Sequence, residues 1–65
     1  MSTINENQYA VLMEPDEDGD GWHASVPELK GCVAWGPTQS DAIANITAVR
    51  HVWLELAQER GWRIP

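Results

Sequence analysis

Residues 21–38, GWHASVPELKGCVAWGPT, decide the fold of this chain. Residues 22–26 alternate between apolar and polar side chains, which is typical of a half-buried β-strand. The segment PELKG at 27–31 begins with proline and ends with glycine, so it favours a short turn. A second strand is predicted over residues 32–35, CVAW. Two strands joined by so short a turn predict an antiparallel pair.

A further strand is predicted upstream of this pair, over residues 8–14, QYAVLME, which also alternate. The connector at 15–21, PDEDGDG, contains Asp-Gly twice and is therefore rich in turn-forming residues. Because both connections are short, we expect the three strands to form an antiparallel meander. We expect residues 1–7 to be flexible.

A long helix is predicted after the strands, over residues 38–60, or ~35 Å at the usual rise per residue. Thr38 can cap it by accepting a hydrogen bond from the backbone N–H of Asp41, whose charge suits the positive end of the helix dipole. Gly61 is well placed to end the helix. The expected apolar stripe consists of Ala42, Ile46, Val49, Trp53 and Leu56. The predicted fold is therefore α+β in the order β-β-β-α, with a possible short strand at 62–64.

Both faces of the predicted sheet carry apolar side chains. The side chains expected to face the helix are Tyr9, Val11, Met13, Trp22, Ala24, Val26, Cys32 and Ala34. The opposite face would carry Leu12, His23, Val33 and Trp35. A tryptophan beside valine and leucine on one small face is more often covered than exposed.

Self-association is the expected way to cover these side chains. Ile43, Val52 and Leu54 fall off the main helical stripe, which a helix touching only its own strands does not explain. A chain of 65 residues also buries only about 60% of its unfolded surface, and oligomerisation compensates for so small a core. We therefore expect a dimer or tetramer, with contacts at Leu12, Val33, Trp35 and Val52.

Composition limits the remaining possibilities. One small domain, 1–65, accounts for the length, and a single cysteine excludes an intramolecular disulfide. No apolar run approaches a membrane span, and the N-terminus lacks the pattern of a signal peptide, so a soluble, cytoplasmic protein is expected. The net charge is -6 with only four scattered Lys and Arg residues, so this chain alone is not expected to bind nucleic acid.

The carboxylates are concentrated in the first connector, where five of the seven residues from Glu14 to Asp20 are acidic. Such a surface could meet a basic protein, or it could simply keep the turn soluble. The expected partner-binding residues are Glu14, Asp16, Asp18, Asp20 and Trp22. Residues 16–21 also match the first half of an EF-hand calcium loop, but its twelfth position is Pro27 and its flanks are predicted strands. No metal site is therefore expected.

The sequence contains no motif for catalysis. His23 and His51 have no spacing partner that would make them a base or a metal-ligand pair. Cys32 has little nearby positive charge to activate its thiol, and it lies where a small core residue belongs. Nucleophile-elbow, phosphate-loop and paired-cysteine motifs are missing from the sequence. We expect a non-enzymatic protein without cofactors.

A resemblance to a known family covers about residues 8–65. Glycine and an aromatic residue at Gly21-Trp22, the run Pro27-Glu28-Leu29-Lys30-Gly31-Cys32, and Gly36-Pro37-Thr38 before a helix are similar to the pattern of HicB antitoxins. The matched residues are of turn, cap and core types. The resemblance implies a partial RNase H-like fold without a nuclease site, and a partner, the small basic mRNA-cleaving HicA toxin.

HicB antitoxins usually add a DNA-binding domain, and this chain stops at Pro65, where it would begin. We therefore expect no C-terminal DNA-binding domain, although another chain could supply one. The leading hypothesis is an antitoxin-type protein that binds and occludes a HicA-type toxin. The alternatives are an oligomeric HicB-like module without a toxin and, more remotely, a metal-dependent nuclease.

Overall fold

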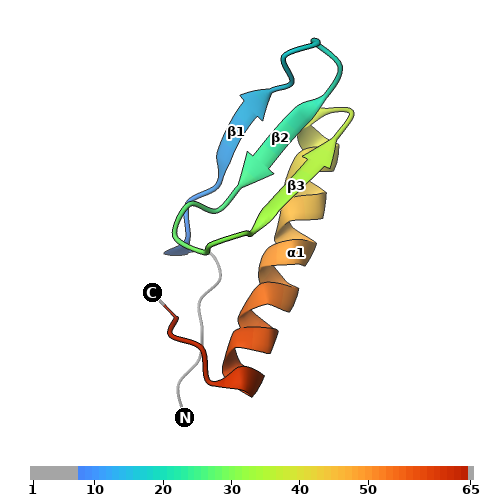
Figure 1. The fold of residues 1–65 in the computed structure, drawn as a ribbon. Helices are drawn as coiled ribbons and strands as arrows, with labels where there is room; N and C mark the ends of the chain where they lie inside the picture. The colour runs from blue at the N-terminus through green and yellow to red at the C-terminus, as the bar shows by residue number, and fades with distance from the viewer. Residues whose placement is uncertain (1–7, 65) are drawn as a thin grey trace.

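The computed structural model describes residues 8–64 and confirms the predicted α+β order. Three strands, β1 (Leu12–Pro15), β2 (Trp22–Ser25) and β3 (Val33–Gly36), are followed by one helix, α1 (Gln39–Arg60). The strands form one layer, and α1 packs across β3 and β2 as the second layer (Figure 1). Residues 1–7, predicted to be flexible, lie outside the described residues.

The sheet has the order β1-β2-β3, and both pairs are antiparallel. Met13, Ala24 and Ala34 lie opposite one another on the side that faces α1, and Ala24 is buried. Leu12 and Val33, which flank Ser25 on β2, share the other face and are exposed. The predicted division of the sheet into two apolar faces is therefore confirmed.

The first two strands are shorter than predicted, because proline follows the end of β2. β1 begins at Leu12 rather than Gln8 and runs through Pro15. In this register the residue that would next bond to β1 is Pro27, opposite residue 10, and proline has no N–H to donate. The compact loop at 26–32, in which Val26 donates its N–H to the carbonyl of Cys32, shifts β3 by one residue, from the predicted 32–35 to 33–36.

Both ends of α1 match the prediction. The hydroxyl of Thr38 accepts a hydrogen bond from the backbone N–H of Asp41 at 3.1 Å and donates one to its carboxylate at 3.0 Å. Gly61 ends the helix in the left-handed conformation, with φ of 68°. At the other end, a side chain on Gly36 would collide with the backbone of Asp41 and Ala42. Glycine there lets β3 lie directly against the first turn of α1.

The predicted strand at 62–64 is wrong. After Gly61 the chain turns back along the helix, and the N–H of Trp62 donates to the carbonyl of Ala57 at 2.8 Å. The ring of Trp62 packs on Trp53, with ring centroids 5.9 Å apart, and Ile64 packs against the core. These contacts hold the tail beside the helix rather than at a sheet edge.

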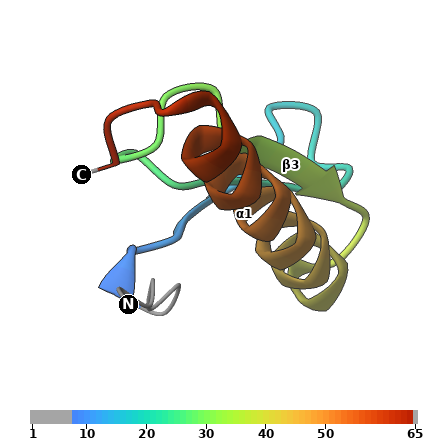
Figure 2. The same ribbon diagram turned by 90° about the horizontal axis from the view of Figure 1, so that it is seen from below.

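The core lies between α1, the sheet and the loop at 26–32. Its buried apolar residues are Tyr9, Ala24, Val26, Leu29, Cys32, Ala42, Ile46, Leu54 and Ala57. The end-on view shows α1 seated over the strands (Figure 2). In Figure 1 the C-terminal half of α1 extends beyond β3, where Trp53 donates its indole N–H to the carbonyl of Lys30 at 3.0 Å.

The buried stripe of α1 corrects one prediction. Leu54, expected off the stripe, is 3% exposed in the core, whereas Leu56, expected on it, is only half-buried. The buried positions follow Ala42, Ile46, Arg50 and Leu54 in steps of four residues. Arg50 is 7% exposed, and its charge hid this line in the sequence. Long side chains of this kind can cover apolar surface with their stems.

Candidate functional site

The acidic connector between β1 and β2 is organised by Asp16. Its carboxylate accepts a hydrogen bond from the backbone N–H of Asp18 at 3.1 Å, and its carbonyl accepts from Gly19 at 2.9 Å. Its own N–H donates to the carbonyl of Gly21 at 3.0 Å. The bond from Asp18 holds the pKa of the Asp16 carboxyl below its ordinary value, and the neighbouring His23 lowers that pKa further. Asp16 therefore stays charged and shapes the turn.

His23 connects this turn to the sheet. Its Nε2 lies 3.2 Å from the Asp16 carboxylate, and along the strands it stands between Glu14 and Trp35. The indole of Trp35 lies over Gly21, where any added side chain would collide with the ring. Gly21 also has a positive φ of 105°, so it satisfies both the turn and the ring above it.

We define the outer sheet face by the side chains that point away from α1. They are Leu12, Glu14, His23, Ser25, Val33 and Trp35. The three apolar members are Leu12, Val33 and Trp35, exposed to 48%, 63% and 45%. The predicted position of Trp35 opposite the helix-facing side is therefore confirmed.

The acidic connector and the outer sheet face form one continuous surface. Glu14 and His23 line a shallow hollow with Pro15, Asp16 and Glu17, and they also line a second hollow over the outer sheet face. Trp35 borders that second hollow and a third one at the tip of the turn. Exposed carboxylates thus border one end of a face that carries exposed apolar side chains.

The predicted partner-binding residues do not all lie on this surface. Glu14, Asp16, Asp18 and Asp20 belong to the acidic connector or its edge, as predicted. Trp22 instead lies on the helix-facing side of β2, half-buried against the core. Trp35 is the aromatic residue that borders the acidic turn, and its place there depends on the pairing of β2 with β3.

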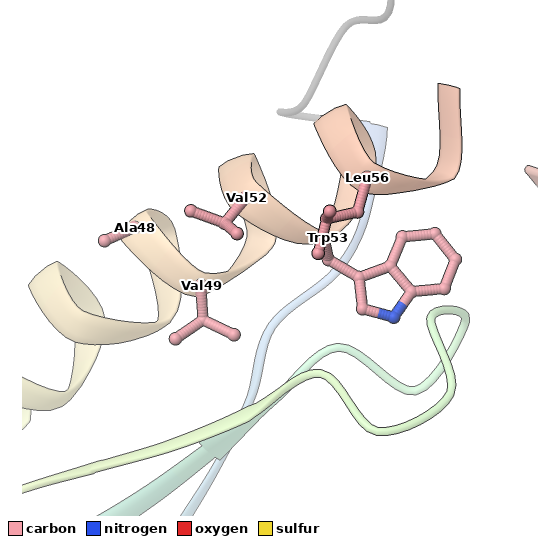
Figure 3. Close-up of a pocket in the computed structure, with 5 residues that line it drawn as sticks. All are labelled: Ala48, Val49, Val52, Trp53 and Leu56. Atoms are coloured by element: carbon pink, nitrogen blue, oxygen red, sulfur yellow. The ribbon is translucent and has the colours of Figure 1, made fainter. Parts of the chain in front are cut away.

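A second surface lies on α1. Five apolar side chains, which we call the helix groove, line an open hollow of about 380 Å³: Ala48, Val49, Val52, Trp53 and Leu56. Val49 and Trp53 point toward the strands and the loop, while Val52 lies on the far side of the helix from them (Figure 3). The spacing of Ala48, Val52 and Leu56 at every fourth position signals this line in the sequence, although the prediction did not use it.

The predicted oligomer contacts are divided between the two surfaces. Leu12, Val33 and Trp35 lie together on the outer sheet face. Val52, which is 53% exposed, lies in the helix groove instead. Ile43 is also exposed on α1 but does not line the groove.

The remaining candidate reactive groups have ordinary surroundings. Cys32 is buried, and this burial raises the pKa of its thiol, with the positive charge of Arg50 acting in the opposite direction. The Nε2 of His51 lies 3.0 Å from Glu55 one turn later on α1. Among residues 8–64 no three His, Cys, Asp or Glu side chains form a group that could hold a metal ion. In the same part of the chain, no helix combines the length and apolar character needed to cross a membrane.

Comparison with known proteins gives matches over most of the chain. Residues 9–65 match the family model described as the HicB-like antitoxin of bacterial toxin-antitoxin systems. A UPF0150 protein of Synechocystis is 47% identical over 47 residues, covering 72% of this chain and 58% of that protein. Another from Synechocystis is 33% identical, covering 88% of this chain and 77% of the relative.

A UPF0150 protein of Thermoplasma acidophilum is also similar, at 33% identity over 58 residues, which is 89% of this chain and 83% of the relative. No solved structure matches the chain significantly. The chain thus spans between about half and four-fifths of the length of these relatives.

Proposed function

The chain belongs to the HicB-like antitoxin family, and from this premise we propose that it binds and occludes a basic, mRNA-cleaving toxin of the HicA type. The observation that carries the proposal is the continuity of the acidic connector with the outer sheet face. A toxin that holds RNA must present positive charge, so a surface of exposed carboxylates is complementary to it.

The two parts of this surface have different roles. Glu14, Glu17, Asp18 and Asp20 are exposed, and their charges attract a basic protein and compete with RNA for it. Exposed charges act mainly on the rate of encounter. Leu12, Val33 and Trp35 supply apolar area whose burial holds the complex together. The toxin is thereby blocked by contact, and the antitoxin family suggests that this chain is itself non-catalytic.

The proposed role also concerns assembly and place. We propose that the protein acts as a homo-oligomer, because the helix groove exposes apolar side chains that the proposed toxin contact leaves uncovered. We place its action in the cytoplasm, where a toxin that cleaves mRNA finds its substrate. Three antiparallel strands followed by one helix support the partial RNase H-like fold that the family resemblance implies.

The test is expression of this chain with the small basic reading frame adjacent to its gene. We expect co-expression to restore growth and the two proteins to purify as one complex. A neighbour whose toxicity persists and which forms no complex would contradict the proposal and favour a HicB-like module without a toxin. Magnesium-dependent RNA cleavage by the purified chain would instead indicate a nuclease.

A matched pair of variants tests the surface itself. Glu17→Gln/Asp18→Asn removes two exposed charges from the acidic connector, and Glu28→Gln/Glu59→Gln removes two exposed charges elsewhere. Asp16 is left unchanged because it shapes the turn. At low salt we expect the first variant to associate with the toxin roughly threefold more slowly or worse, since steering by local charge changes rates by factors of ten or more. Equal rates for both variants in stopped-flow mixing would place the toxin elsewhere.

A further inference from the structure

We propose that the helix groove is the self-association surface, where a second copy of this chain packs its α1 antiparallel to the first, with the two-fold axis at Val52. This inference rests on the homo-oligomer of the proposed function and assigns it an interface. It leaves the outer sheet face, with its acidic border, free for the toxin.

The lining of the helix groove suits contact with an apolar surface. All five lining side chains are apolar, and none carries a charge. Val52 is 53% exposed although it stands at the centre of this line, between Ala48 and Leu56. The carboxylates of Glu55 and Glu59 line an adjoining hollow that shares Val52 and Leu56, so negative charge borders the groove but does not line it. The groove therefore fits an apolar helix better than it fits a cationic protein.

Apolar side chains are evenly spaced on either side of Val52 along α1. A two-fold dimer requires a surface that is complementary to itself. In an antiparallel pair centred on Val52, Ala48 of one copy shares a layer with Leu56 of the other, because each lies four residues from the centre. Small and large side chains then meet and interdigitate. A parallel pair would place leucine against leucine and alanine against alanine.

The distribution of charge along the molecule also favours an antiparallel pair. A chain with a net charge of -6 repels its own copies, and most of its turn carboxylates lie at the end of the molecule where α1 begins (Figure 1). Antiparallel pairing through the C-terminal half of α1 places the two acidic connectors at opposite ends of the dimer.

The size of the contact sets the expected affinity. The lining residues lie within 48–56, about two and a half turns of α1 from each copy. We expect so short a contact to bury less than the ~800 Å² per partner of a typical stable complex. We therefore expect a dimer with a micromolar dissociation constant, visible as a concentration-dependent mass.

The experiment is sedimentation equilibrium of the full chain from micromolar to millimolar concentration. We expect the wild type to shift from one to two copies and Val52→Glu to remain a monomer, with dimerisation weakened at least tenfold. Ile43→Glu is the matched control, since Ile43 is 50% exposed on the same helix but lies outside the groove. It should dimerise like the wild type.

A mixture of two variants tests the axis. Residue 52 faces itself in the proposed dimer, so Val52→Glu and Val52→Lys should each be monomeric alone and form a mixed dimer when combined. Circular dichroism confirms that each variant is folded. A wild type that stays monomeric at millimolar concentration, an unimpaired Val52→Glu, or a mixture that does not associate would each overturn the proposal.

Toxin binding separates this inference from the proposed function. Val52→Glu should bind the HicA-type toxin at the wild-type rate while remaining monomeric. Failure of the wild type to bind any toxin, with dimerisation through residue 52 intact, would contradict the proposed function alone. Loss of toxin binding in a folded Val52→Glu would show that the toxin uses the helix groove, which contradicts the division of roles proposed here.

Discussion

The outer sheet face and the helix groove both expose apolar side chains, but they differ in what surrounds them. The apolar side chains of the outer sheet face share it with Glu14 and His23. Trp35 also borders the acidic connector. The helix groove contains five apolar side chains and no charge. A mixed surface suits a partner of opposite charge, and an uncharged one suits a copy of itself.

The difference follows from the geometry of the two elements. Each four-residue strand places only two side chains on the outer sheet face. On this small face Trp35 lies directly beside the polar side chain of His23. α1 has 22 residues and extends beyond the sheet, so its C-terminal half has more circumference than the core can cover. The uncovered line repeats every fourth residue and remains uniformly apolar.

The largest expected effect separates the groove from the core. Leu54→Ala removes a side chain that is 3% exposed and should cost about 2–5 kcal/mol of unfolding free energy. Leu56→Ala removes the same atoms two positions later, in the groove, and should cost much less in dilute solution, where the chain is monomeric. Urea unfolding of both variants measures the difference. Equal losses would mean that the groove belongs to the core of the protomer.

An intermediate effect tests how Trp35 is held on the outer sheet face. Gly21→Ala introduces a methyl group into the Trp35 ring and should cost about 1–3 kcal/mol from overpacking, beyond the strain of its positive φ. Gly19→Ala is the matched control, because Gly19 also has a positive φ but has open space around its added methyl. The two melting temperatures, compared at one concentration, isolate the ring contact. If both variants melt alike, Trp35 is not seated over Gly21 in solution.

The smallest effect concerns the charge of the acidic connector beside the outer sheet face. The pKa of Asp16 is lowered in the folded chain, chiefly by the N–H of Asp18, so the unfolded chain takes up a proton first as the pH falls. The resulting stabilisation is present above about pH 3.9, the ordinary aspartate value, and is lost on acidification through the lower folded value. Asp16→Asn should flatten this acid limb of the stability curve. The turn itself should persist at neutral pH, because the side-chain oxygen of asparagine can accept the same hydrogen bond from the N–H of Asp18. A pH titration of urea unfolding checks it, and an unchanged acid limb would contradict this account.

The sequence predicted features that depend on neighbours along the chain. Alternation in the strands placed Trp35 and Val33 on the correct face, because a period of two tolerates small errors in strand ends. The cap at Thr38 and the stop at Gly61 were predictable because each depends on a few local atoms. The family resemblance, likewise, rested on turn and cap residues.

Features that depend on tertiary packing were not predictable in the same way. The late start of β1 follows from its register on β2, which brings residue 10 opposite Pro27, and no alternation pattern reveals that pairing. Leu54 and Leu56 are both compatible with a helical stripe of apolar residues. Leu54 is the buried one, since it continues the buried line through Arg50, whose charge does not suggest burial. The contact of Trp35 with the connector required the actual pairing of β2 and β3. Of the predicted partner-binding residues, the carboxylates lie on the connector or its edge and Trp22 lies on the helix-facing side of the sheet, and their part in binding stays a prediction.

The order of the sheet also bears on how the chain folds. Each strand pairs with the next along the chain, and α1 packs on β3, the strand just before it. Every loop that must close before these contacts form is short, so the entropy lost at each step is small and folding should be rapid for a protein that contains a sheet. Tyr9 is the exception, because it shares a core with Leu54 from the far end of the helix. Its docking joins the two ends of the described chain, so we expect it to come late in folding, with substitution there accelerating unfolding more than it slows folding.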